Sequence, residues 1–424
     1  MSTHPLTLDA LCPFCASHGF SWREASGMDA SLRADWNSLV SEKRLFLRPR
    51  FLNILREGDP DRFRFLIAYR DEQPVAAMAF QLTHLAGRAL RDYVPGPLAA
   101  DPDREDKAGF RTWILNTLDR QQWRMVATGT VFAPSEPGFA FHPSLTSQER
   151  EGLLRSGLNT VCRDWKGVRL LLVTRTDLVM GGFNAITADS EMVFKLDSDW
   201  KTFEDYLKAM SSKYRVRAKK IYKESASLNR RELTLEEVEA ISAQLDQSYL
   251  DVAQRAGFNV AYLGKDHFLR MKRDFGDDFV VVAWYDKSEK LVGFHTGLMR
   301  RNQLEARYVG LDYEANSRYR LYQRMLYDFI EMAFRYKRRK IHFGRTAPEI
   351  KSTVGALPQP AGYYLRHRNP IIRTVLAPFL KQSGPPQVTI RQPFRKKLGD
   401  AEGQSEHGDA NGIPVAASGD AAQE

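Results

Sequence analysis

Two stretches of the chain repeat the same order of hydrophobic and polar positions. Residues 63–70 and 75–82 are apolar segments separated by a polar turn at 71–74, and this pattern predicts two paired strands. The same order returns at 279–285 and 290–299, again around a short polar turn. Because each pair follows helical sequence and precedes further helix and strand, we expect two related α/β units in tandem.

Further periodicities complete these two units. Thr234 is followed three residues later by Glu237, which is the spacing of a capping box, so we expect a helix to begin at Leu235. Apolar residues at helical spacing predict other helices, and short apolar or alternating runs predict other strands. The predicted helices lie at 108–123, 147–165, 200–210, 211–226, 235–256 and 317–337, and the further strands at 168–174, 191–196, 304–311 and 340–343.

Changes in composition mark the boundaries of the units. Gly181 and Gly182 break the chain, and we therefore place the first unit at residues 30–185 and the second at 190–380. Residues 398–424 are small and polar, with too few large apolar side chains to offset the entropy lost on folding. We expect this last segment to be a disordered acidic tail.

The charge of the chain is unevenly distributed. The 424 residues have a net charge of +10, but the tail holds six acidic residues and neither Lys nor Arg, so the rest carries +16. Such an excess indicates an anionic partner. The phosphates of CoA, a nucleic acid such as tRNA and an anionic membrane surface all fit, and charge alone leaves these three open.

Composition also bears on location and on metal binding. The sequence contains no run of about 18 apolar residues, as a membrane span would need, and its first residues lack a basic leader followed by an apolar segment. We therefore expect a cytoplasmic protein. Cys12 and Cys15 have the spacing of half a zinc site, but no second pair completes it. We expect no metal site, and interpret the two thiols as incidental parts of a weakly ordered N-terminus.

Two helical segments carry side chains suited to phosphate. The basic run in the helix at 211–226 is either a solvated surface or a phosphate-binding face. The start of the helix at 317–337 offers unpaired backbone N–H groups to an anion, and a simple polar helix cap is the alternative. The residues concerned are Lys213 and Arg215 in the first segment, and Asn316, Ser317, Arg318 and Arg320 in the second.

The end of the last predicted strand and the loop after it bring together a histidine, an acidic residue and two basic residues. His342 and Glu349 have the chemistry of a general base for an amine, as does Glu305 on the preceding strand. Lys351 is suited to a phosphate or a developing oxyanion, and Arg345 lies within the same ten residues. For His342, an inward-facing structural role is an equal alternative. Since no Ser or Cys nucleophile with a paired base is visible, we expect direct attack by a deprotonated amine.

The succession of these features resembles a known superfamily. A basic helix, paired strands at 279–299, a long helix, and a late strand followed by Lys351 and Gly355 are similar to the BioF-like acetyltransferase branch of the GNAT superfamily. More distantly, they resemble the Fem-type peptidyltransferases, which contain tandem GNAT folds. The resemblance implies an α/β protein of tandem GNAT-like domains with mixed central sheets. It implies transfer of an acyl group from acyl-CoA, such as acetyl-CoA, to an amine, with no permanently bound cofactor.

The resemblance assigns the candidate residues to roles. One of the three acid or histidine candidates would deprotonate the amine, while the basic side chains would orient donor and acceptor. The assignment is Glu305, His342, Glu349 and Lys351 to catalysis, Asn316, Ser317, Arg318 and Arg320 to the donor phosphates, and Lys213, Arg215 and Arg345 to substrate.

One departure from the GNAT pattern concerns the donor. GNAT enzymes place a glycine-rich loop before the long helix, where backbone amides hold the CoA pyrophosphate, whereas residues 312–320 contain no glycine. In Fem-type relatives the donor is an aminoacyl-tRNA, so transfer from tRNA in cell-wall precursor synthesis is the alternative. A non-catalytic protein that binds nucleic acid or a membrane surface is a third possibility. The sequence leaves the acceptor open.

Overall fold

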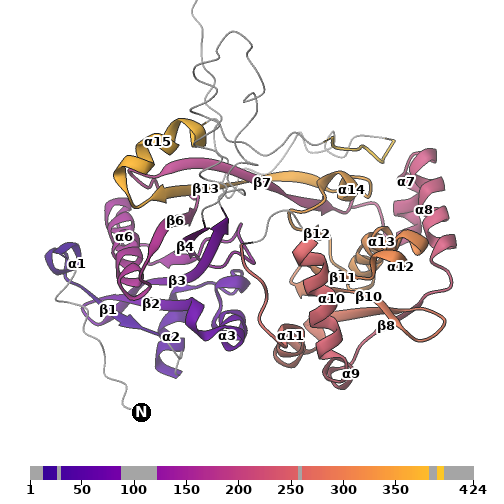
Figure 1. The fold of residues 1–424 in the computed structure, drawn as a ribbon, viewed down its shortest axis with the longest axis horizontal. Helices are drawn as coiled ribbons and strands as arrows, with labels where there is room; N and C mark the ends of the chain where they lie inside the picture. Colours follow the sequence, from indigo (N-terminus) through magenta and orange to yellow (C-terminus); the bar gives the residue numbers. More distant parts are fainter. Residues whose placement is uncertain (1–12, 26–29, 87–121, 256–259, 382–388, 396–424) are drawn as a thin grey trace, which may run out of the picture.

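The computed structural model describes residues 13–25, 30–86, 122–255, 260–381 and 389–395, which fold around one mixed β-sheet covered by helices on its two faces (Figure 1). The predicted acidic tail and most of the predicted helix at 108–123 lie outside these residues. Gln122 and Trp123, at the end of that predicted helix, instead begin a strand. The expected α/β class with a mixed sheet is confirmed, and the sheets of the two expected units are joined into one.

The first half of the sheet comes from the N-terminal part of the chain. Strands β2, β3 and β4 are antiparallel neighbours, and helix α6 then leads to β6, which is parallel to β4. Strand β1 pairs with β2, and the short β5 pairs with β3. These elements are β1 (Phe20–Glu24), β2 (Phe63–Arg70), β3 (Gln73–Ala86), β4 (Gln122–Thr128), β5 (Phe139–Phe141), α6 (Ser147–Asp164) and β6 (Val168–Thr174).

The second half repeats this arrangement. Strands β9, β10 and β11 are antiparallel neighbours, helix α13 leads to β12, which is parallel to β11, and β8 pairs with β9. The predicted repeat of element order is therefore confirmed. The elements are β8 (Asn229–Glu232), β9 (Phe279–Tyr285), β10 (Leu291–Arg300), β11 (Gln303–Leu311), α13 (Leu321–Arg335) and β12 (Lys340–His342).

The two strands at the centre of the sheet exchange partners. Strand β7 (Asn184–Lys195) follows β6 in the chain but pairs with β12, while β13 (Leu357–His367) follows β12 in the chain but pairs with β6. The two strands also pair with each other, antiparallel. The sheet therefore has the order β1-β2-β3-β4-β6-β13-β7-β12-β11-β10-β9-β8, and each half is completed by a strand that follows the other half in the chain.

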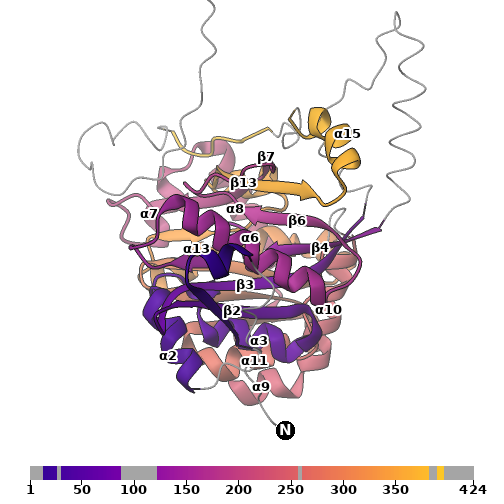
Figure 2. The same ribbon diagram turned by 90° about the vertical axis from the view of Figure 1, so that its left-hand side faces the viewer.

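The helices form two layers. On one face, which we call the inner face, a single core extends across the two halves of the sheet, and α11 contacts α3 across the junction. On the opposite, outer face, each half has its own core, and the helices that cover the sheet can be followed in Figures 1 and 2. The inner helices are α2 (Ala30–Leu39), α3 (Pro49–Gly58), α9 (Leu235–Ala240), α10 (Ser242–Arg255) and α11 (His267–Phe275), and the outer ones are α6, α7 (Phe203–Ala209), α8 (Ser212–Glu224), α12 (Tyr313–Tyr319) and α13.

The remaining elements lie outside these two layers. Cys15 lies in α1 and is buried, and its sulfur accepts a hydrogen bond from Nε1 of Trp22 at 3.1 Å. The interpretation of this thiol as part of a weakly ordered N-terminus is therefore wrong, while Cys12 lies outside the described residues. The short elements are α1 (Pro13–Ser17), η2 (Leu45–Leu47), η3 (Pro60–Arg62), η4 (Gly276–Asp278) and α14 (Pro348–Ser352), and a longer helix, α15 (Pro370–Lys381), follows β13.

Two predicted helices are each divided in the structure. The helix expected at 317–337 consists of α12 and α13, which meet at Arg320 in the left-handed conformation (φ 52°). The helix expected at 235–256 is broken at Ile241 into α9 and α10. Within the described ranges, no helix is both long and apolar enough to cross a bilayer, and no group of His, Cys, Asp and Glu side chains has the arrangement of a metal site.

Candidate active site

Polar side chains gather on the inner face where the two halves of the sheet meet. Glu305 on β11 is directly opposite His342 on β12, and it is paired with Leu298, a member of the inner core. His342 is opposite Val193 on β7. Since side chains two residues apart on a strand share a face, Glu191 lies on the same face as His342. The Oε2 of Glu191 is 3.8 Å from Nδ1 of His342.

Lys351 reaches this group from α14. The chain leaves β12 through Gly344, whose positive φ of 71° lets it turn towards the helix, and Nζ of Lys351 donates to the backbone oxygen of Gly344 at 3.4 Å. Burial lowers the pKa of Lys351 to about 7, the charge of Glu191 acts in the opposite direction, and Arg345 adds to the lowering. A lysine in this state exchanges its proton near neutral pH. We call Glu191, Glu305, His342 and Lys351 the central cluster.

Glu191 stays ionised within the central cluster. Burial alone would raise its pKa, but the polar groups of His342 and Ser135 and the charge of Arg307 hold the pKa below its ordinary value. The Nε2 of His342 is buried and has no hydrogen-bond partner among the residues that the structure describes. A carboxylate beside Nδ1 favours the tautomer that carries its proton there, which leaves Nε2 ready to accept a proton.

Glu305 is paired with two arginines. Nη1 of Arg300 lies 3.2 Å from Oε1 of Glu305, and Nε of Arg307 lies 3.9 Å from Oε2. The two guanidinium groups stack over the ring of Phe46 from the first half, at 5.1 Å for Arg300 and 4.0 Å for Arg307. Glu305 therefore positions two arginines that contact the first half of the molecule. Of the base candidates Glu305 and His342, His342 is the one with a nitrogen that lacks a partner among the described residues.

Residues 130–137, which we call the bridging segment, close the central cluster from the first half. Oε1 of Gln81 on β3 accepts two hydrogen bonds from the start of this segment, at 2.8 and 2.9 Å. Nη1 of Arg307 donates to the backbone oxygen of Phe132 at 2.6 Å. Further along, the Ser135 hydroxyl helps to hold the pKa of Glu191 below its ordinary value. The site is therefore formed by the two halves together.

The structure brings some of the predicted residues together and separates others. Glu305, His342 and Lys351 form most of the central cluster, and Arg345 is near enough to affect the pKa of Lys351. Glu349 is exposed on the same short helix as Lys351 and forms an ion pair with Arg391.

The predicted substrate-binding residues Lys213 and Arg215 lie on α8. This helix packs on the outer face through Ala218 and Ile221, so the sheet separates it from the central cluster. Nη1 of Arg215 approaches the backbone oxygens of Lys208 and Met210, at 3.4 Å each. The exposed basic side chains of α8 are Lys213, Arg217, Lys219, Lys220 and Lys223.

The predicted donor-binding residues form the junction between α12 and α13. Oδ1 of Asn316 accepts a hydrogen bond from the backbone N–H of Tyr322 at 2.9 Å and so caps α13, as the simpler alternative expected. The start of α12 is closed by Asp312, whose carboxylate accepts from two backbone N–H groups of the first turn. The other contacts are Ser317 with the backbone oxygen of Tyr313, Arg318 over the ring of Tyr319, and Arg320 with Glu224.

Glu191, Arg307 and the bridging segment did not emerge from the sequence as site residues. A signal existed for Glu191, because Met192 and Phe194 are the apolar positions of an alternating strand and belong to the outer core. Glu191 consequently faces the opposite, inner side. The bridging segment gave no such signal, because its contacts join residues that are far apart in the chain.

Comparison with known proteins identifies a family. The FemAB-like family, described as one of peptidoglycan biosynthesis/recognition, matches residues 129–393, which is more than half of the chain. No curated protein matches the chain. Saccharomyces cerevisiae N-myristoyltransferase with bound myristoyl-CoA has 11% identity and a TM-score of 0.46, over 86% of this chain and 85% of that one. A GCN5-related N-acetyltransferase from Kribbella flavida has 12% identity and a TM-score of 0.43, over 83% of this chain and 72% of that one.

Proposed function

We propose that this chain, which belongs to the FemAB-like family, transfers an acyl group to an amine acceptor at the central cluster. The observation that carries the proposal is the burial of Lys351, with a pKa of about 7, beside the ionised Glu191. Strongly shifted pKa values gather where proton transfer and charge stabilisation occur. The description of the family supports an acceptor of peptidoglycan metabolism.

The proposed reaction is a direct transfer. The amine nitrogen attacks the acyl carbonyl carbon, and Nε2 of His342 accepts the proton that the nitrogen loses. Glu191 holds the other ring nitrogen and stabilises the imidazolium. The ammonium of Lys351 stabilises the oxyanion of the tetrahedral intermediate. The bond from the carbonyl carbon to the leaving group then breaks, and the proton passes from His342 to the leaving oxygen or sulfur.

The acyl donor is either acyl-CoA or an aminoacyl-tRNA. The carboxylate of Asp312 closes the start of α12, at the position where the GNAT pattern would hold the CoA pyrophosphate. A carboxylate repels phosphate, so this feature disfavours a CoA pyrophosphate at this position. An aminoacyl-tRNA carries its acyl group as an ester and needs no pyrophosphate there. The exposed basic side chains of α8 are suited to a large polyanion that extends beyond the central cluster, from which the sheet separates them.

Transfer assays with the full chain test the proposal. Acetyl-CoA and aminoacyl-tRNA are each offered as donor with amine-bearing peptidoglycan precursors as acceptors. Lys351→Met should lower kcat by about a hundredfold or more, because the oxyanion loses its cationic partner. Lys337→Met, which changes an exposed lysine, is the matched control and should leave kcat unchanged. Transfer that persists in Lys351→Met would refute the assignment, and RNA binding without transfer from either donor would favour a non-catalytic role.

The pH dependence of the rate gives a second test of Lys351. The ammonium form exists below the pKa of about 7 and is lost as the pH rises through it, so kcat should fall on the alkaline side of neutrality. Arginine stays protonated throughout this range. In Lys351→Arg the alkaline fall should therefore move to higher pH, whatever the residual rate. The measurement is kcat between pH 6 and 9, and an identical alkaline limb in the two proteins would contradict the role of Lys351.

A further inference from the structure

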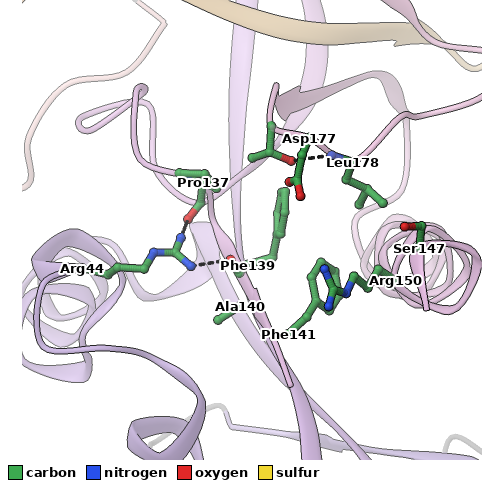
Figure 3. A pocket seen from close by; sticks show the side chains of 10 residues that line it. Arg44, Pro137, Phe139, Ala140, Phe141, Ser147, Arg150, Asp177 and Leu178 are labelled. Carbon is green, nitrogen blue, oxygen red and sulfur yellow. Dashed lines mark hydrogen bonds between the residues drawn. The ribbon is translucent and has the colours of Figure 1, made fainter. Parts of the chain in front are cut away.

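The connection between β6 and β7 presents an aromatic ring to arginines from two other elements. Its residues 176–178 first line a small cavity (Figure 3), the chain then turns at the glycine pair 181–182, and Phe183 follows. The guanidinium carbon of Arg155 on α6 lies 5.6 Å from the centre of the Phe183 ring, and that of Arg366 on β13 lies 5.5 Å from it. Two cations from separate elements are therefore held over one ring.

Two further arginines lie close to Arg366. Arg368 follows the end of β13, and its Nη1 donates to the backbone oxygen of Val168 at 3.3 Å. Arg373 lies near the start of α15. Burial lowers the pKa of Arg366, and the like charges of its three arginine neighbours lower it further, that of Arg373 most. We call these four residues, Arg155, Arg366, Arg368 and Arg373, the arginine cluster.

Only one charge of the arginine cluster is balanced within the part of the chain that the structure describes. Nη2 of Arg155 lies 2.6 Å from Oε1 of Glu151, on the same helix. Among the described residues, no acid pairs with Arg366, Arg368 or Arg373. Arg366 and Arg373 are also half-buried, so water solvates their charges only in part. Cations that repel one another and are partly removed from water are costly, and an anion between them would be stabilising.

The arginine cluster lies away from the central cluster. Arg366 is paired with Leu171 on β6, and Leu171 belongs to the outer core of the first half. Because directly opposite residues on paired strands share a face, Arg366 lies on the outer face, whereas the central cluster is on the inner one. At Gly182 no atom lies within 4 Å of the place that a Cβ would take, so the turn before Phe183 leaves open space.

We propose that the arginine cluster binds the phosphate group of a phosphate monoester or of inorganic phosphate. A guanidinium group donates two parallel hydrogen bonds to phosphate oxygens, and Arg366 and Arg373 have donors free for them. A phosphate monoester carries a charge of about −1.5 to −2 at pH 7, so it offsets the unpaired cations better than a carboxylate or a phosphodiester with its single charge. This binding goes beyond the proposed transfer reaction and does not depend on it.

Calorimetric titration of the full chain with small anions tests the ligand chemistry. Inorganic phosphate and methyl phosphate should bind, whereas dimethyl phosphate and acetate, each with a single charge, should bind more weakly by about tenfold or more. The affinity for methyl phosphate should also fall from about pH 8 to about pH 5, because a phosphate monoester loses its second charge near pH 6 while arginine stays protonated. No binding of phosphate at millimolar concentration would overturn the proposal, and so would acetate that binds as tightly as phosphate.

Variants locate the binding at the arginine cluster. Arg366→Gln and Arg373→Gln should each weaken the binding of methyl phosphate by about tenfold or more, since each removes a charged hydrogen-bond donor. Arg301→Gln, which changes an exposed arginine in the turn between β10 and β11, is the control and should leave the affinity unchanged. Thermal unfolding in buffer without phosphate checks that each variant is folded. Methyl phosphate that binds folded Arg366→Gln and Arg373→Gln as tightly as the wild type would overturn the assignment.

Vesicles distinguish the two sources of such a phosphate group. Phosphatidic acid presents a phosphate monoester at a membrane surface, so sedimentation of the chain with vesicles that contain it, lost in Arg366→Gln, would identify a lipid headgroup. Binding of methyl phosphate without binding to these vesicles would identify a soluble phosphate compound. Absence of transfer activity with intact phosphate binding would contradict only the proposed function, and transfer without phosphate binding would contradict only this inference.

Discussion

Lys351 loses most of its hydration on folding, and its pKa falls from an ordinary value of 10.5 to about 7. Between these two values the unfolded chain binds the proton and the folded chain does not, so this group makes the free energy of unfolding increase with pH. Below pH 7 Lys351 is protonated in the folded chain, which then carries the full free-energy cost of a buried ammonium group. Lys351→Met should therefore raise the free energy of unfolding at pH 6 by on the order of a few kcal/mol.

The difference in the free energy of unfolding between Lys351→Met and the wild type should become smaller as the pH rises. Urea unfolding of the wild type and Lys351→Met at pH 6 and pH 9 measures it, with Lys337→Met as the exposed control. Equal stability of the two proteins at pH 6 would mean that Lys351 is better solvated than its 4% exposed fraction indicates. The expected trade of higher stability for lower activity is typical of buried charges kept for function.

Candidate site residues can be predicted from the sequence where the residue type itself indicates the chemistry. Lys351, His342 and Glu305 were found because their chemistry and spacing are visible in the chain. Glu191, whose charge acts on the pKa of Lys351, lies on β7, and only the register of the sheet shows that it is a neighbour of His342 on β12.

At the scale of elements, the bridging segment is the part of the first half that reaches the central cluster. Ser135→Ala removes a hydroxyl that helps to hold the pKa of Glu191 below its ordinary value, and should reduce kcat by about tenfold, with little change in the KM of the donor. Ser144→Ala, an exposed change in the loop before α6, is the control. The pH profile of kcat should also shift, because the Glu191 pKa is partly set by this hydroxyl. A change in KM alone would assign Ser135 to substrate binding instead.

Elements were predicted well where their cause is local. The strand pairs around 71–74 and 286–289 follow from polar turns between apolar runs, and they were found. The break at Arg320 was missed because the apolar stripe continues along α13 while the interruption depends on one left-handed residue and on the Asn316 cap. The exchange of β7 and β13 was also missed, because pairing between strands far apart in the chain leaves no local pattern.

At the scale of the whole molecule, the exchanged strands should make the two halves unfold together. Leu365 on β13 is 2% exposed, and β13 bonds to β6 on one side and to β7 on the other. Leu365→Ala should cost about 2–5 kcal/mol and shift the unfolding of both halves equally. Amide hydrogen exchange of β3 and β10 in urea measures the unfolding of each half. Val179→Ala, which changes a residue that is 69% exposed, is the control. Loss of protection in β3 while β10 stays protected would show independent halves.

The exchanged strands also impose an order on events during synthesis. Strand β6 ends at Thr174, whereas β13, its neighbour in the sheet, begins at Leu357, roughly 180 residues later. At about 5–20 residues per second, the ribosome needs on the order of 10–40 s to make the intervening chain. Throughout that interval the nascent first half has an open strand edge, which is a template for pairing with other chains. The ribosome-bound chain should therefore depend on chaperones until β13 emerges, late in translation.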